Sequence, residues 1–526
     1  MSENTIISEN VSRTLGQNAQ RSNILAAKLI AEIVKTTLGP KGMDKMLVDS
    51  ANNITVTNDG ITILEEIEID HPAAKMMIEI AKTQETEVGD GTTTVTILAG
   101  KLLENAEKLL DKKIHPTTII KGYRAASEKA LEILKELAFP IGNRELLKQI
   151  ASTAMTGKEA EGSKEHLAEL IVSAVDKISE GQEINLNDIS TATIVGEEIK
   201  KSELIHGVIL EKNRANLNMP KVIRNAKILL LDIALEIRNP ETETRISVST
   251  PEQLDAFLQS EENYLKELTN KIIQSGANTI FCQKGIDDVA QYYLAKNNIF
   301  AVRRVPQSKL TEISRATSAK IISNLNDISE SQLGNSETVE EIQKRDNSII
   351  YIRGCKNPRT ITLLLKGSTL HVAEEIERAV KDGIGDVVAS IKSSGIVPGG
   401  GAIEIELSKR LKTFAKTLGG REQLAIESFA DSLETIPETL AENAGLDPID
   451  ILTELRKQHE SGMQNHGLNL FNNQIEDTFS CGIIEPLKIK TQAITSATEF
   501  ANMILRIDDV LISSKQPKEI KQKEID

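Results

Sequence analysis

Apolar residues recur at helical spacing towards both ends of the chain. From about Ile24 to Leu137 the pattern is mainly that of amphipathic helices, and Leu98–Leu110 places its leucines on one stripe. Helical periodicity returns at Leu424–Leu455 and at Thr491–Ile512. Two helical blocks at opposite ends of a chain can pack as one domain, with the remaining residues inserted between them.

The middle of the chain has a different pattern, in which short aliphatic runs alternate with helical stretches. Two helices are predicted at Asp287–Lys296 and Lys309–Thr317. The aliphatic runs predict buried strands at Lys227–Asp232, Thr279–Cys282, Ala301–Val305, Ser348–Ile352 and Thr360–Leu365. This alternation indicates an α/β domain over about 218–366.

The length of 526 residues exceeds what one hydrophobic core organises, and suggests about three domains. The fold class predicted is therefore multidomain, α and α/β. Its parts are a helical domain from residues 1–150 and 399–526, a small connecting domain from 151–217 and 367–398, and the α/β domain 218–366. Pro398–Gly401 is a plausible hinge, and the charged tail from Ser513 is expected to be disordered.

Composition and charge exclude several functions. Lys and Arg number 62 against 77 Asp and Glu, which gives a net charge of −15. An acidic surface repels phosphate backbones and anionic lipids, so neither nucleic acid nor membrane is expected as a partner. The N-terminus does not resemble a signal peptide, and a cytoplasmic location is expected. Cys282, Cys355 and Cys481 are far apart in sequence and predict buried free thiols, not disulfides or a zinc site.

The most informative motif is VGDGTTT at Val88–Thr94, directly before the Leu98–Leu110 helix. Glycines let a backbone approach a ligand closely, and a helix N-terminus offers unpaired amides to phosphate. The threonines add hydroxyl donors, and Asp90 supplies the hard oxygen that Mg²⁺ prefers. The alternative interpretation is a capped helix start after a tight turn.

Two other loops carry glycine. Thr37–Gly42 follows a helix that ends near Val34, and it also fits a helix C-cap followed by proline. Thr57–Gly60 contains Asp-Gly and predicts a hairpin turn. Neither a P-loop nor a GxGxxG motif occurs in the chain, so ATP would need a different cradle.

A well-formed helix start lies in the middle of the chain, with Thr250 as cap and Pro251 at the first helical position. The simplest interpretation of the helix is that it faces a core. An apolar stripe at a mobile tip would instead bind a neighbour or an unfolded chain. The stripe at helical spacing comprises Leu254, Phe257, Leu258, Leu265, Leu268 and Ile272.

The order of the motifs resembles the chaperonin family along nearly the whole chain. The segment FCQKGIDDVAQYYLAKNNIFAVRRV at Phe281–Val305 is similar to thermosome subunits, so the resemblance is to the group II branch. The ordered motifs are TLGPKGMDKML at Thr37–Leu47, TNDGITIL at Thr57–Leu64, VGDGTTT at Val88–Thr94, TGKEAE at Thr156–Glu161, ERAVKDG at Glu377–Gly383, PGGGAIE at Pro398–Glu404, GIIEPLKIKTQAITSATE at Gly482–Glu499 and ILRIDDV at Ile504–Val510.

The resemblance implies chaperonin architecture: a helical equatorial ATP domain, a small intermediate domain and an α/β apical domain whose helical protrusion acts as a built-in lid. It implies a double ring of identical or paralogous subunits that encloses non-native protein substrates and closes with ATP binding and hydrolysis. Two other functions remain open at this point, namely an ATP-binding metabolic enzyme such as a kinase and a structural ring protein that does not hydrolyse ATP.

The resemblance also assigns site residues for ATP and Mg²⁺. Asp382 matches the catalytic aspartate and Asp59 a second carboxylate near the attacking water, which suits phosphoryl transfer by positioning and proton acceptance. Asp90 matches the Mg²⁺ ligand and Lys158 a sensor of the γ-phosphate. The nucleotide would further contact Thr37, Leu38, Gly39, Pro40, Gly91, Thr92, Thr93, Thr94, Gly400, Asn469 and Glu485.

The sequence departs from the family pattern around the catalytic aspartate. Gly383 stands where the family commonly has alanine, and Gly385 follows. Each glycine costs a helix about 1 kcal/mol, so a looser helix is expected here. Asp386 lies one turn after Asp382 and competes for the catalytic assignment, but ERAVKD favours Asp382. Glu485 stands where the bacterial branch has a ribose-binding aspartate.

Overall fold

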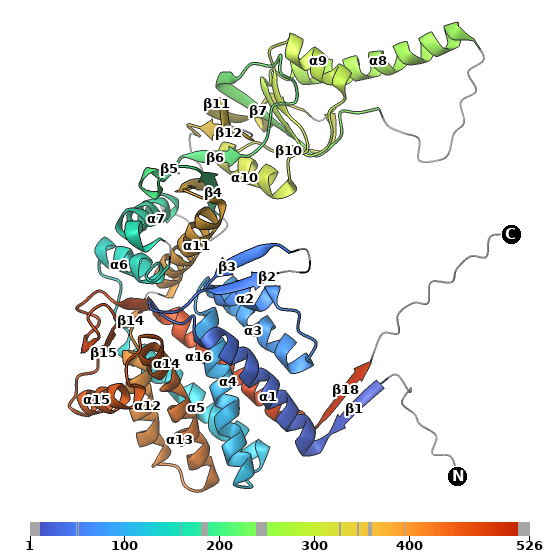
Figure 1. The fold of residues 1–526 in the computed structure, drawn as a ribbon. Helices are drawn as coiled ribbons and strands as arrows, with labels where there is room; N and C mark the ends of the chain where they lie inside the picture. The colour runs from blue at the N-terminus through green and yellow to red at the C-terminus, as the bar shows by residue number, and fades with distance from the viewer. Residues whose placement is uncertain are drawn as a thin grey trace, which may run out of the picture. The chain divides into compact units, whose positions relative to one another are not determined.

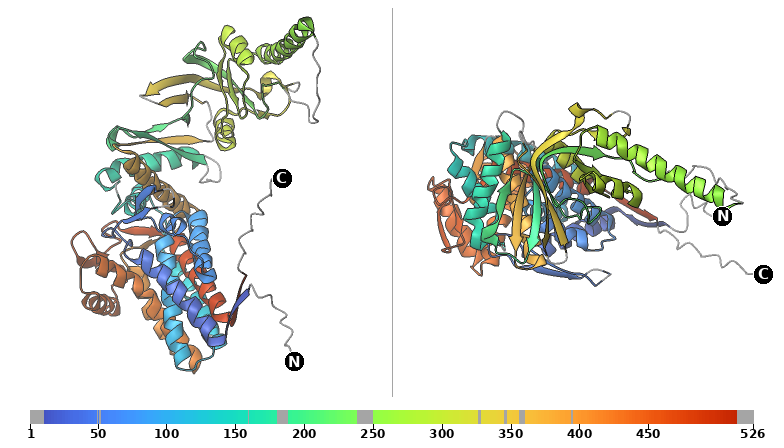
Figure 2. Two further views of the ribbon diagram at one scale, coloured as in Figure 1. Left: turned by 45° about the vertical axis from the view of Figure 1, so that its right-hand side comes forward. Right: turned by 90° about the horizontal axis from the view of Figure 1, so that it is seen from above.

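The computed structural model describes residues 11–48, 50, 52–158, 160–179, 188–237, 250–325, 328–344, 347–355, 360–393 and 395–513. The chain forms two units, Met1–Val172 together with Glu374–Asp526, and Ser173–Ala373 (Figures 1 and 2). The three domains and their boundaries stay a prediction.

The first unit combines helices from both ends of the chain, which Figure 1 shows as blue and orange-red ribbons side by side. Helix α4 is central, because it packs against α1, α13 and α16. Apolar side chains from both ends, such as Leu102, Phe429 and Phe500, form one core. The main helices are α1 Gly16–Lys35, α3 Pro72–Val88, α4 Thr92–Asp111, α5 Pro116–Leu137, α12 Ala402–Ala415, α13 Arg421–Leu433, α14 Thr435–Asn443, α15 Pro448–Glu460 and α16 Leu487–Arg506.

Shorter elements complete the first unit. Helix α2 spans Gly60–Glu66. Helix α6 Arg144–Ala154 is followed by a 3-10 turn at Glu161–Ser163 and by α7 Lys164–Ser179, whose last residues belong to the second unit. Helix α11 spans Leu370–Ser393. The strand pairs are β1 Val11–Leu15 with β18 Asp509–Ser513, β2 Lys45–Val48 with β3 Ile54–Thr57, β14 Ile396–Pro398 with β17 Ile484–Pro486, and β15 His466–Asn469 with β16 Gln474–Asp477.

Two local predictions in this unit are wrong. Thr57–Gly60 is no hairpin turn, because the hairpin turns between Val48 and Ile54 and Asp59 instead caps α2 by accepting from the Thr62 amide at 3.0 Å. An aspartate satisfies an exposed helix amide as readily as it enters a turn. The helical pattern from Thr491 also stops early, since α16 ends at Arg506 and a strand follows. Of the predicted tail, Ser513 ends β18 and the rest lies outside the described residues.

The second unit is α/β, as the alternating pattern predicts. Parallel strands β7, β8 and β9 lie beside antiparallel strands β11, β12 and β6. A smaller sheet has the order β4-β13-β5. The strands are β4 Ile189–Val195, β5 Glu203–Ile205, β6 Gly207–Leu210, β7 Val222–Leu231, β8 Thr279–Cys282, β9 Phe300–Val302, β10 Ile321–Ile322, β11 Gly334–Lys344, β12 Asn347–Arg353 and β13 Ile361–Gly367. The helices are α8 Pro251–Gln274, α9 Asp288–Lys296 and α10 Gln307–Thr317, with 3-10 turns at Ile199–Lys201 and Glu330–Gln332.

The unbroken aliphatic end of β7 follows from its position in the sheet. Ile228 and Leu230 belong to one buried cluster with Leu310 of α10, whereas Leu229 belongs to another with Leu294 of α9. Because successive side chains of a strand point to opposite faces, a strand covered on both faces needs apolar residues at every position. Burial on both faces therefore explains why apolar residues occupy consecutive positions of β7 instead of alternating with polar ones.

Helix α8 is divided along its length. Its cap is as predicted, with the Thr250 hydroxyl accepting from the Gln253 amide at 3.3 Å. Towards the C-terminal end Leu265 and Ile272 are buried, whereas Phe257 and Leu258 are 38% and 53% exposed. Leu254, also part of the predicted stripe, has a side chain that lies outside the described part of the structure. The apolar stripe thus serves a core at one end and faces solvent at the other.

The three cysteines differ in exposure. Cys282 and Cys355 are buried and free, but Cys481 is exposed, so the prediction of three buried thiols is wrong for Cys481. Throughout the described ranges, no helix combines the length and the apolar character that crossing a membrane requires.

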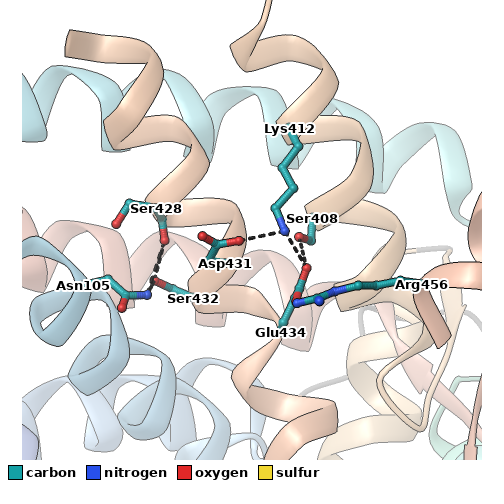
Figure 3. Close-up of polar contacts among 8 residues, drawn as sticks. All are labelled: Asn105, Ser408, Lys412, Ser428, Asp431, Ser432, Glu434 and Arg456. Atoms are coloured by element: carbon teal, nitrogen blue, oxygen red, sulfur yellow. Dashed lines mark hydrogen bonds and ion pairs between the residues drawn. The ribbon is translucent and has the colours of Figure 1, made fainter. Parts of the chain in front are cut away.

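A charged network around the buried carboxylate of Glu434 connects the helices near α14 (Figure 3). Glu434, at the junction of α13 and α14, accepts hydrogen bonds from Ser408 at 2.7 Å, Lys412 at 2.8 Å and the Arg456 guanidinium. Burial alone would raise the pKa of Glu434, but these donors outweigh it and lower the pKa. One carboxylate therefore joins α12, α15 and the α13–α14 junction.

Glu434→Gln should destabilise the first unit, because it leaves the donors of Ser408, Lys412 and Arg456 facing a neutral amide. We expect a loss of roughly 1.5–3 kcal/mol, the usual range for hydrogen bonds to charged groups. Since the pKa of Glu434 is lowered by folding, its contribution is present above pH 4.5 and is lost on acidification, so the difference between the two proteins should shrink at low pH. The measurement is chemical unfolding at several pH values. Asp431→Asn, which removes only an exposed partner of Lys412, is the control and should have little effect.

Candidate functional site

The first unit contains a cavity of about 310 Å³, within the size range of small-molecule sites. It brings together residues that are hundreds of positions apart in the sequence. The predicted site residues that line it are Thr37, Leu38, Gly39, Pro40, Asp59, Asp90, Gly91, Thr92, Thr93, Thr94, Lys158, Asp382, Gly400 and Glu485. Asn469 is the predicted site residue that does not line the cavity.

The GDGTTT motif forms the turn from α3 into α4. Gly89 and Gly91 have φ of 88° and 84°, in the left-handed region that glycine adopts without strain. Asp90 lies between them, and its Oδ1 accepts from the Gly91 amide at 2.6 Å. The N-terminal turn of α4, with its threonines, lines the cavity and directs unpaired helix amides to it. The geometry is that of an anion site with a carboxylate beside it.

The loop after α1 forms another wall of the cavity. Gly39 has φ of 82°, and a Cβ there would lie 2.4 Å from Leu440 Cδ2 of α14. Asn443, at the end of α14, donates to the carbonyls of Lys35 and Leu38 at 3.0 and 2.9 Å. Helix α14 therefore holds this loop in place, and the Glu434 network holds α14.

Asp59 lies at the start of α2, next to the GDGTTT turn. Its Oδ2 accepts from the Thr62 amide at 3.0 Å and from the Thr62 hydroxyl at 2.6 Å. A Cβ at Gly60 would lie 2.5 Å from the Thr93 hydroxyl, so the two loops are in direct contact. The capping bonds fix the orientation of Asp59 at the cavity wall.

Lys158 and Asp382 form a buried ion pair at the cavity. Lys158 follows α6, and Asp382 lies in α11. Burial, with Asp90 and Asp59 nearby, raises the pKa of Asp382 to about 7, although Lys158 acts in the opposite direction. Burial would lower the pKa of Lys158, but Asp382 and Asp90 outweigh it and raise that pKa. The pair joins a cation and a carboxylate at the predicted γ-phosphate end.

Lys490 of α16 also lines the cavity and binds two carboxylates. Its Nζ lies 2.8 Å from Glu404 Oε1 and 2.6 Å from Glu485 Oε2. Burial raises the pKa of Glu485, although Lys490 opposes the shift. Lys490 was not predicted from the sequence, because nothing near it along the chain marks it as the partner of a residue 86 positions earlier, Glu404.

Of two residues predicted to lie near the base, Gly400 lines the cavity and Asn469 does not. Gly400 has φ of 66°, accepts from the Leu468 amide at 2.8 Å and lines the cavity. Asn469 donates to Glu476 at 2.6 Å within the β15–β16 hairpin, between two residues that line the cavity, Leu468 and Leu470. Its predicted contact with the base stays a prediction. Movement of the Pro398–Gly401 turn also stays a prediction.

Asp386 lines the cavity as well, although it is not among the predicted ligands. It is 3% exposed, and its Oδ1 has no hydrogen-bond partner. Burial, followed by Asp90 and Asp382, raises the pKa of Asp386 well above its ordinary value. The available sequence signal is the spacing of four residues from Asp382, which puts both carboxylates on one helix face.

The two glycines of α11 lie where the helix approaches other backbone. A Cβ at Gly385 would lie 2.8 Å from the Val88 carbonyl oxygen and 2.9 Å from Gly89 Cα, and one at Gly383 would lie 2.9 Å from Ile171 Cδ1. Helix α11 is unbroken from Leu370 to Ser393. Glycine at 385 therefore permits close contact with the GDGTTT turn.

One helical unit with such a cavity and one α/β unit with a capped, half-exposed helix, together in a single chain, are the fold class of the chaperonins. The chain belongs to the TCP-1/cpn60 chaperonin family, whose pattern it matches over residues 30–515. It is 52% identical over 520 residues to thermosome subunit beta of Archaeoglobus fulgidus, covering 98% of this chain and 95% of that protein. It is 50% identical to the thermosome subunit of Methanopyrus kandleri over 519 residues and to that of Pyrococcus horikoshii over 520, again covering 98% of this chain and 95% of each relative.

These similarities confirm three predictions from the sequence. The resemblance to group II chaperonins is confirmed, and so are the multidomain α and α/β fold class and the function of an ATP-dependent group II chaperonin. The roles of individual site residues are not tested by them.

Gly385→Ala should destabilise the first unit by about 1–3 kcal/mol, because the added methyl group would overlap rigid backbone at Val88 and Gly89. Gly383→Ala should cost much less, since the nearest atom is the end of the flexible Ile171 side chain and alanine favours the helix. The thermal unfolding midpoint measures both. Gly419→Ala, where no atom lies within 4 Å of the new methyl group, is the control. Equal midpoints for the three variants would contradict this account of α11.

Proposed function

We propose that the chain is an ATPase subunit of a double-ring chaperone, and that its cavity binds ATP with Mg²⁺. The observation that carries this proposal is the convergence of an anion-binding helix N-terminus, Asp90 and the Lys158–Asp382 pair in one cavity. The family supports nucleotide use, and the donor set fits the ligand. Amides and threonine hydroxyls suit phosphate oxygens, and Asp90 suits a hard divalent cation.

The residues of the chain divide the work of hydrolysis. Asp90 would hold Mg²⁺, which neutralises phosphate charge when bound. Residues Gly91–Thr94 would hold the phosphates, and Lys158 the terminal one. Asp382 would orient a water molecule and accept its proton as the water oxygen bonds to the γ-phosphorus and the bond to the β–γ bridging oxygen breaks, with Asp59 as a second carboxylate. A pKa raised by burial suits a group that must take up a proton.

The partners follow from the family and from α8. Thermosome subunits named alpha and beta occur together in Archaeoglobus fulgidus, which supports identical or paralogous neighbours in a double ring. The exposed Phe257 and Leu258 support contact with non-native protein substrates. A cytoplasmic location stays a prediction. A metabolic kinase would need a second, small-molecule substrate, and a structural ring would bind ATP without turnover.

Asp382→Asn should reduce ATP hydrolysis by at least 100-fold while ATP still binds, because the amide keeps the shape of the carboxylate but cannot accept the proton of the attacking water. ATP binding and steady-state phosphate release are measured on the same assembled preparation. Glu377→Gln, on the same helix but away from the cavity, is the control. Normal turnover in Asp382→Asn would remove the residue from its role, and loss confined to Asp386→Asn would transfer that role to Asp386.

Phe257→Ser and Leu258→Ser should weaken capture of a chemically unfolded protein while leaving ATP hydrolysis and the unfolding midpoint unchanged, since both side chains are exposed. Gln259→Ser controls for a change at the polar face of the same helix. Leu265→Ala, at the buried end, should instead destabilise the second unit by about 2–5 kcal/mol. Undiminished capture by the two serine variants would exclude this part of α8 as a substrate contact.

A further inference from the structure

One carboxylate in the cavity has no part in the mechanism above. Asp386 is buried, lines the cavity, and has an oxygen without a hydrogen-bond partner. Removing a carboxylate from water without a compensating partner is costly, so it is retained in a folded protein only where the cost is small or a ligand offsets it.

The charges around Asp386 do not supply that partner. Asp90, Asp382 and Glu485 are negative and add to the burial of Asp386, and Lys158 is the nearby cation that opposes them. Lys158, however, is paired with Asp382. Lys490, at the same cavity, is held between Glu404 and Glu485. Both lysines are therefore paired with other carboxylates. A third lysine that lines the cavity, Lys164, lies over the Phe471 ring, with its Nζ 4.7 Å from the ring centroid. A cation bound in the cavity would supply the positive charge that these lysines do not direct to Asp386.

The backbone places Asp386 beside the predicted metal ligand. The contact between Gly385 and Gly89 joins α11 to the GDGTTT turn, and the next residue on each side is a carboxylate, Asp386 on α11 and Asp90 on the turn. Among the described residues, three or more His, Cys, Asp or Glu side chains do not converge into a preformed metal cage. A cation here would complete its shell with water and phosphate oxygens, as Mg²⁺ commonly does with one or two carboxylates.

We propose that Asp386 is a second carboxylate, beside Asp90, for the divalent cation that enters with the nucleotide, bound directly or through one water molecule. The inference rests on the proposed function, since the cation arrives with ATP or ADP. Asp386 binds the cation and takes no part in the chemical step. Its charge is compensated when the cation is present.

Mn²⁺ is a suitable probe, because its binding in the presence of ADP is observed directly by electron paramagnetic resonance and needs no hydrolysis. The assembled full-length protein is titrated in four forms: wild type, Asp386→Asn, Asp90→Asn and Glu377→Gln. Asparagine keeps the shape of Asp386 and removes its charge. We expect Asp386→Asn to weaken Mn²⁺ binding about tenfold or more, Asp90→Asn to weaken it at least as much, and Glu377→Gln to leave it unchanged.

The double variant Asp90→Asn, Asp386→Asn should weaken Mn²⁺ binding by less than the product of the two single effects, because both residues act on one cation. A merely structural role of Asp386 predicts a lower unfolding midpoint without Mn²⁺, whereas we expect the midpoint of Asp386→Asn to be unchanged or higher. If Asp386→Asn does not assemble, Asp386→Ala carries the same measurement.

The outcomes separate this inference from the proposed function. If wild type binds Mn²⁺ with ADP, Asp90→Asn weakens the binding and Asp386→Asn does not, the inference is overturned and the ATP site stands. Asp386 would then be a neutral acid that donates a hydrogen bond, a role that asparagine also fills. If wild type binds neither Mn²⁺ nor ADP, the proposed function fails.

Discussion

The candidate site depends on the close approach of α11 to the turn between α3 and α4. Gly385 meets the backbone at Val88 and Gly89 without a side chain between them, and this contact brings Asp382 and Asp386 to the cavity that Asp90 also lines. A bulkier residue at the contact would move the carboxylates of α11 away from the α4 N-terminus. A packing constraint at one glycine therefore places two of the carboxylates that line the cavity.

The cavity lining contains more carboxylates than cationic side chains. Asp59, Asp90, Asp382, Asp386 and Glu485 line the cavity, and two of the lysines there are paired with carboxylates. Such a site repels a bare polyphosphate and accepts one that carries its own cations. The helix amides at Thr92–Thr94 supply the positive potential that the side chains lack. For the nucleotide proposed above, the charge of the cavity would favour the metal-bound form over the free one.

The sequence predicted the elements of this site better than it predicted their connections. The anion-binding helix start was predicted at VGDGTTT, and α4 begins at Thr92, directly after the glycines and earlier than the Leu98–Leu110 stripe indicates. Asp59 was assigned a turn because Asp-Gly favours hairpins, but the tertiary contact of Gly60 with Thr93 selects a helix start instead. The pairing of Lys490 with two carboxylates and the exposure of Cys481 both depend on which distant segments are in contact. A local sequence pattern does not predict such contacts. The sequence showed that Asp386 lies one helix turn from Asp382. It did not show that an oxygen of Asp386 would be buried without a hydrogen-bond partner. The division of α8 into a buried and an exposed end likewise depends on where α9 stops covering it.

The pairing of β1 with β18 has a consequence for how the chain acquires its structure. Arg13 and Asp509, which form an ion pair across these strands, are 496 positions apart. Helix α4 likewise needs α13 and α16 before its apolar face is covered. During synthesis the N-terminal helices therefore leave the ribosome long before their partners exist, whereas the second unit is contiguous and can fold as soon as it emerges. We expect the inserted unit to be native first, and the cavity to form only when α16, which supplies Ile489 and Lys490 to its lining, has been made.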